Sequence, residues 1–180
     1  MQSKGVGTSL KHFAANNQET DRLRISANIS QRALREIYFP AFEHIVKEAQ
    51  PWTIMCAYNC INGVHAAQDH WLLTDVLRDE WGFQGIVMSD WGADHDRVAS
   101  LNAGLNLEMP PSYTDDQIVY AARDGRIQPA QLDHMAQGMI DLVNKTRAAM
   151  SIENYRFDIR SSRRSRTSGG HRIHGAAQER

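Results

Sequence analysis

The 180-residue chain lacks the features that mark three large classes of protein. Its formal net charge is −1, which gives no bias toward nucleic acid. No apolar run approaches the roughly 20 residues of a membrane-spanning helix. The first residues lack the apolar core of a secretory signal peptide. We therefore expect one domain's length of globular chain in the cytoplasm, with neither nucleic acid nor membranes as partners.

Cysteine is also scarce, and its placement excludes two kinds of structural support. Cys56 and Cys60 are the only two, and no second Cys or His pair stands at zinc-binding spacing. Buried free thiols are the better interpretation, and they favour a reducing compartment. A glycine-rich phosphate loop is missing after every predicted strand, which argues against a nucleotide-binding sheet.

What the chain does contain is a regular alternation of short apolar segments and amphipathic helical patterns. Pro40 interrupts the first helical pattern and predicts either a kink or two short helices there. The alternation favours a parallel sheet of about four βα units, in either an open doubly wound sheet or part of a (β/α)8 barrel. The predicted strands cover 7–11, 52–56, 86–88 and 105–109, and the helices cover 30–49, 70–81, 94–103, 114–125 and 129–150.

Polar side chains gather where these predicted strands end. Asp90 and Trp91 follow the third strand, and Glu108 ends the fourth. Asp90 alone fits a helix cap as well as a reactive carboxylate. Lys11 and His12, together with residues 55–59, put polar groups at the same end of the other two strands. Shared placement at the carboxyl ends is typical of the catalytic face of a barrel, so the functional interpretation of Asp90 is favoured.

Several motifs resemble glycoside hydrolase family 3, most closely its β-glucosidase branch, and they run in order over most of the chain. The resemblance implies that residues 1–157 form the C-terminal half of that family's catalytic (β/α)8 TIM-type barrel domain. The motifs are Lys11-His12-Phe13, Asn16-Asn17-Gln18-Glu19-Thr20, Met55-Cys56-Ala57-Tyr58-Asn59, Val87-Met88-Ser89-Asp90-Trp91-Gly92-Ala93 and Ala103-Gly104-Leu105-Asn106-Leu107-Glu108-Met109-Pro110.

The resemblance also implies a reaction and a role for each matching residue. Asp90 would be the nucleophile of a retaining hydrolase of terminal, non-reducing β-D-glucosyl groups, a chemistry that needs no metal or organic cofactor. The substrate would be a small β-glucoside or oligosaccharide. The implied substrate-binding residues are Lys11, His12, Met55, Tyr58 and Trp91. Taken singly, each of the first four has an ordinary alternative: a solvated strand end, a core histidine or a packing residue.

The second carboxyl that a retaining mechanism requires is not assigned within this chain. It would stand about 5 to 5.5 Å from the nucleophile. In the family resembled, it comes from a second domain further along. Glu108 is expected to serve the scaffold, and Glu19 is left open between a loop salt bridge and a substrate contact. We therefore expect a fragment that is poorly folded or inactive on its own. An inactive sugar-binding remnant, or pseudogene product, is the rival hypothesis.

The end of the chain differs in composition from the rest. Residues 159–180 hold six arginines and one glutamate. We expect residues 158–180 to form a basic tail, either disordered or produced by a frameshift, and favour the frameshift. An unrelated barrel lyase with Lys11 as Schiff base is a third hypothesis, disfavoured by the Asp90-Trp91 context.

Overall fold

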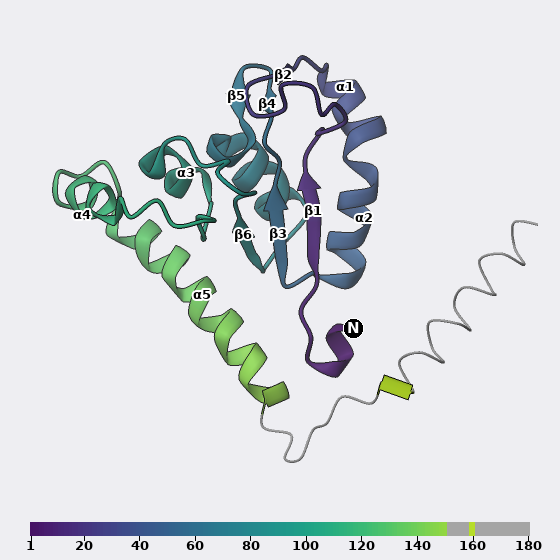
Figure 1. The fold of residues 1–180 in the computed structure, drawn as a ribbon, viewed down its shortest axis with the longest axis vertical. Helices are drawn as coiled ribbons and strands as arrows, with labels where there is room; N and C mark the ends of the chain where they lie inside the picture. The colour runs from purple at the N-terminus through teal and green to yellow at the C-terminus, as the bar shows by residue number, and fades with distance from the viewer. Residues whose placement is uncertain (151–158, 161–180) are drawn as a thin grey trace, which may run out of the picture. The chain divides into compact units, whose positions relative to one another are not determined.

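The computed structural model describes residues 1–150 and 159–160, and its centre is a three-stranded parallel sheet (Figure 1). The strand order is β1 (Ser9–Phe13), β3 (Thr53–Cys56) and β6 (Ile86–Met88). The α/β class predicted from the sequence is therefore confirmed. Apart from residues 159–160, the basic tail predicted over 158–180 lies outside the described residues.

Strand β1 carries an irregularity just where the first predicted site residues occur. Its register on β3 shifts between Leu10 and Phe13, and the peptide bonds Lys11–His12 and Phe13–Ala14 are cis. The strand also ends two residues later than predicted, so Lys11 and His12 lie within β1 rather than at its end.

Helices pack around this sheet. The helix predicted over 30–49 is divided at Pro40, one of the two outcomes expected from the proline. Pro40 is the first residue of α2 (Pro40–Ala49), where it needs no hydrogen-bond donor. No helix in the described part of the chain is both long and apolar enough to cross a membrane. The remaining helical elements are η1 (Gln2–Lys4), α1 (Gln31–Ala33), η2 (Leu34–Tyr38), η3 (Ala66–Gln68), η4 (Trp71–Glu80), α3 (Arg97–Ala103), α4 (Asp115–Arg123) and α5 (Pro129–Met150).

The prediction of a fourth strand over 105–109 is wrong. Only one parallel bridge forms there, between Met88 and Leu107. The side chain of Asn106 explains the interruption, because its Oδ1 accepts the hydrogen bond of Val87 N at 2.9 Å and so replaces a backbone carbonyl in the ladder. The segment still lies beside β6, but it continues the sheet without being a regular strand.

A second small sheet was not predicted. Strand β2 (Ser26–Ala27) pairs in parallel with β4 (Cys60–Ile61), which forms a hairpin with β5 (Val64–His65). Figure 1 shows these strands beyond the end of β1 and β3. Each has only two residues, too few to show the alternation by which a strand is recognised in a sequence.

The core lies between the main sheet and the helices. Phe13 is fully buried at its centre, and its ring packs against Phe39, Phe42 and Trp81 with centroids 5.2 to 6.0 Å apart. Phe13 directly follows His12, so this aromatic cluster anchors the end of β1 to the core. The core thus anchors one of the segments that carry the candidate site.

Candidate active site

Asp90 stands two residues beyond the end of β6, on a segment tied firmly to its neighbour. The buried Ser89 hydroxyl accepts a hydrogen bond from Met109 N at 2.7 Å and donates one to Met109 O at 3.1 Å. Asp96, not Asp90, caps the following helix α3, since its carboxylate accepts from Val98 N and Ala99 N. The helix-cap interpretation of Asp90 is therefore excluded.

Two neighbours hold the Asp90 carboxylate in place. Its Oδ1 accepts a hydrogen bond from Trp91 N at 2.7 Å, and its Oδ2 lies 3.2 Å from Nε2 of His12. The Asp90 side chain is 14% exposed and that of His12 is 34% exposed. The carboxylate is thus held by one hydrogen bond and one close contact with an imidazole nitrogen, yet it remains partly exposed, as a nucleophile needs.

Tyr58 closes one side of this group. Its ring is buried and its hydroxyl donates to Trp91 O at 3.0 Å. Burial raises the pKa of the Tyr58 phenol, and the nearby negative charge of Asp90 raises it further. The phenol therefore remains a neutral donor over the physiological pH range.

The remaining predicted residues differ in how closely they join this group. Met55 lies half-buried in β3, opposite Met88, between β1, which carries His12, and β6, which precedes Asp90. Trp91 is 63% exposed, so it is open to solvent beside Asp90. Lys11 is exposed, and no ion pair joins it to a carboxylate among residues 1–150.

Sequence reasoning missed Arg22 as a member of this face. Its guanidinium stacks over the Tyr58 ring at 4.7 Å from the centroid, and it pairs with Glu19 at 2.8 Å. The Glu19 side chain is thus engaged in a loop salt bridge, one of the two roles left open for it. Arg22 lies in an irregular loop without periodicity, so no pattern could have placed it against Tyr58.

A buried ion cluster supports the segment that carries Asp90. Arg97 lies 3.2 Å from the Asp94 carboxylate and 3.4 Å from that of Glu108, without hydrogen-bond alignment in the second contact. Ser100 donates to Asp94 at 2.7 Å, and Ser112 donates twice to Glu108. Both carboxylates are therefore engaged within the scaffold, as predicted for Glu108.

Cys56 and Cys60 are both buried free thiols, which confirms the sequence prediction. Burial raises the pKa of Cys56 to about 12, and the negative charges of Asp90 and Asp94 add to this. Neither thiol is a reactive group of the site at neutral pH. Within the described residues, no cluster of three or more His, Cys, Asp or Glu side chains has the arrangement of a metal site.

Known proteins with similar sequences belong to one family. A sequence profile described as "Glycosyl hydrolase family 3 N terminal domain" matches residues 1–142. The exo-α-(1→6)-L-arabinopyranosidase of Bifidobacterium breve is 89% identical over 159 residues, which cover 88% of this chain and 21% of that protein. Thermostable β-glucosidase B of Acetivibrio thermocellus is 47% identical over 156 residues, 86% of this chain and 20% of that protein.

Solved structures agree with the sequence relatives. A glycoside hydrolase family 3 β-glucosidase from Bifidobacterium adolescentis is 88% identical, with a TM-score of 0.87 over 89% of this chain and 24% of that one. The chain thus spans about a fifth of the length of the curated relatives it matches. By its family profile, its relatives and its fold, the chain belongs to glycoside hydrolase family 3, within that family's N-terminal domain.

Proposed function

We propose that this chain carries Asp90 as the nucleophile of a retaining exo-glycosidase. The observation that carries the proposal is the carboxylate's setting: Asp90 follows a parallel strand, is oriented by His12 and Trp91 N, and remains partly open. One Asp90 oxygen would attack the anomeric carbon while the bond to the leaving oxygen breaks. The result would be a glycosyl ester on Asp90 and a free aglycone.

The sugar-binding roles follow from the same setting. His12 would hydrogen-bond a sugar hydroxyl beside its contact with Asp90, and Lys11 would supply a positive charge to the site. The open face of Trp91 would pack against the pyranose ring, with Met55 and Tyr58 bordering the pocket. These residues offer both hydrogen-bond donors and an apolar face, which a sugar ring requires.

The general acid and base belongs, in this proposal, outside the described residues. Two carboxylates that follow Asp90, Asp94 and Glu108, both contact Arg97, and their side chains are buried. Both carboxylates also accept hydrogen bonds from scaffold serines, so both are already engaged within the scaffold. Since the matched residues make up only 21% of that relative's length, the complete reaction would use a carboxyl group from elsewhere in such a protein.

Two substrates are proposed, in order. The first is a terminal β-D-glucosyl group, in line with the β-glucosidases among the relatives. The second is a terminal α-L-arabinopyranosyl group, favoured by the relative that is 89% identical. Both sugars present an equatorial leaving group to the nucleophile. They differ at C4 and in the hydroxymethyl group at C5, which the pentose lacks.

The test uses aryl glycosides whose leaving group needs no protonation. The folded chain is mixed with 2,4-dinitrophenyl β-D-glucoside or 2,4-dinitrophenyl α-L-arabinopyranoside. We expect release of about one equivalent of dinitrophenolate, slow turnover, and faster turnover with azide, which replaces the missing activated water. Asp90→Asn is the control that removes the charge and keeps the shape. A folded chain with no burst on either sugar would support the inactive remnant instead.

A further inference from the structure

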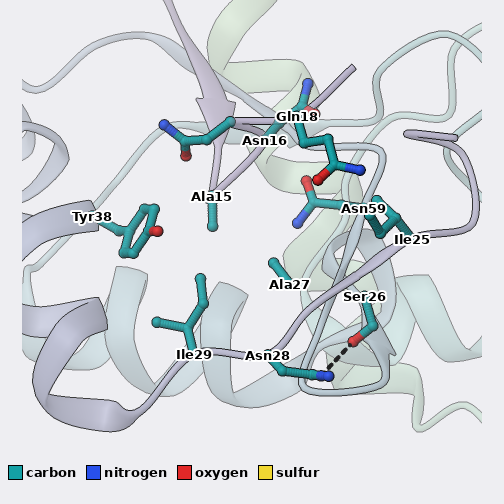
Figure 2. Close-up of a pocket in the computed structure, with 11 residues that line it drawn as sticks. Ala15, Asn16, Gln18, Ile25, Ser26, Ala27, Asn28, Ile29, Tyr38 and Asn59 are labelled. Carbon is teal, nitrogen blue, oxygen red and sulfur yellow. Dashed lines mark hydrogen bonds between the residues drawn. The ribbon is translucent and has the colours of Figure 1, made fainter. Parts of the chain in front are cut away.

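A cavity of about 320 Å³ lies between the loop after β1 and strand β2. None of the residues that surround Asp90 lines it. Figure 2 shows its walls: the loop residues from Ala15 onward above, the segment around Ala27 below, and the Tyr38 ring at one side. Its volume is at the lower end of the about 300 to 1,000 Å³ typical of small-molecule sites, enough for one small ligand.

The lining of this cavity is part polar and part apolar, and it carries no carboxylate, ammonium, guanidinium or imidazole. Its polar groups are amides and hydroxyls, which both donate and accept hydrogen bonds. An ion would find no opposite charge in such a site, whereas a neutral ligand with several hydroxyls would find matching groups. The polar lining residues are Asn16, Asn17, Gln18, Ser26, Asn28, Tyr38 and Asn59.

Two of these amides have oxygens without a partner. Asn59 is 1% exposed, and its Nδ2 donates to Ala14 O at 3.3 Å and Cys60 O at 3.1 Å. These bonds fix the amide, yet its Oδ1 is buried and unpaired within residues 1–150. The Oδ1 atom of Asn16 is likewise buried and has no hydrogen-bond partner within residues 1–150. A buried acceptor that lacks a donor costs free energy, so a ligand that donates hydrogen bonds to these two oxygens would be stabilised.

The wall formed by residues 26–29 is held in place by hydrogen bonds. Ala27 pairs with Ile61 in the small sheet, and Ile29 exchanges two hydrogen bonds with the Asn62 side chain at 2.8 and 2.9 Å. The dashed line in Figure 2 marks a further bond on this wall, from Ser26 to Asn28. This side of the cavity is therefore formed before any ligand arrives.

We propose that this cavity binds a single monosaccharide or a polyol of similar size, at a place separate from Asp90. Ligand hydroxyls donate to the oxygens of Asn16 and Asn59, and the C–H face of the ring packs against Tyr38, whose hydroxyl adds one hydrogen bond. Both amide oxygens are covered in the free chain, so the loop 15–18 shifts when the ligand binds. The proposal depends on the cavity alone and not on hydrolysis at Asp90.

The experiment is a titration of the ¹⁵N-labelled 180-residue chain, followed by amide chemical shifts. D-glucose is the probe, and tetrahydropyran-2-methanol is the matched analogue that keeps the ring but only one hydroxyl. We expect saturable shifts at residues 15–18 and 26–29 with glucose, and none that saturate with the analogue. Tyr38→Phe weakens binding about fivefold, the value of one hydrogen bond. Ala27→Leu fills the cavity and abolishes binding.

Tyr120→Phe is the matched control, because Tyr120 is exposed on α4 and does not line the cavity. An unchanged pattern of amide shifts in each free variant shows that it is folded. Glucose shifts confined to residues around Asp90, or equal affinity in Tyr38→Phe and Tyr120→Phe, would overturn the proposal. Asp90→Asn leaves the cavity shifts in place, so failure of the hydrolase proposal is distinguishable from failure of this one.

Discussion

Replacing Arg97 with alanine should destabilise the chain far more than replacing a surface arginine. The Arg97 side chain is 17% exposed and lies between the buried carboxylates of Asp94 and Glu108. Its third partner, Asp115, is 3.9 Å away and mostly exposed, so it adds little. Removing the cation leaves two buried negative charges without compensation, which costs about 3 to 5 kcal/mol of unfolding free energy.

The chain offers a matched control in Arg35. This residue makes a bidentate pair with Glu80, both bonds 2.7 Å, but its side chain is 44% exposed. Surface pairs contribute below about 1 kcal/mol, so Arg35→Ala should cost less than that even though its geometry is better. Urea unfolding at pH 7 measures both variants. If Arg97→Ala costs no more than Arg35→Ala, the assignment of a supporting role to the buried cluster is wrong.

Two further predictions concern titratable groups. The Cys56 thiol should resist a thiol reagent at pH 8 in the folded chain and react at once in urea. Its pKa is raised to about 12 from 9.0, so its contribution to stability is lost as pH rises from 9 to 12, and Cys56→Ala should flatten that decline. His65 stacks on His95 at 4.1 Å, and burial, then the charge of His95, lowers its pKa. The folded chain then binds fewer protons than the unfolded one below pH 6.5, so its melting temperature should fall on acidification. His65→Gln should reduce that fall, whereas His134→Gln, on an exposed site, should not; equal slopes would contradict the assignment.

The elements predicted well were those with strong local signals. The apolar run 86–88 matches β6, and Pro40 marked the division between two helices. The 105–109 segment has a similar apolar character but is not a regular strand, because Asn106 competes for the ladder through its side chain. The small β2-β4-β5 sheet depends on pairings between distant two-residue segments, and such pairings leave no periodic pattern.

The site shows the same division between local and tertiary information. The ends of parallel strands meet at one edge, which is why Asp90, His12, Tyr58 and Trp91 could be grouped from the sequence and are close together in the structure. Arg22 could not, because only the fold brings its loop over the Tyr58 ring. The Arg97 cluster and the cavity beside β2 likewise arise from contacts between separate segments.

Covalent trapping of a glycosyl group on the chain tests whether Asp90 is a nucleophile. The folded chain is incubated with 2,4-dinitrophenyl 2-deoxy-2-fluoro-β-D-glucoside, whose fluorine slows hydrolysis of the glycosyl ester, and is then digested for peptide mass analysis. We expect one fluoroglucosyl group per chain, on the peptide that contains Asp90, and no label in Asp90→Asn. A label on a different carboxylate, or no label in a chain that is folded and binds the sugar, would contradict it.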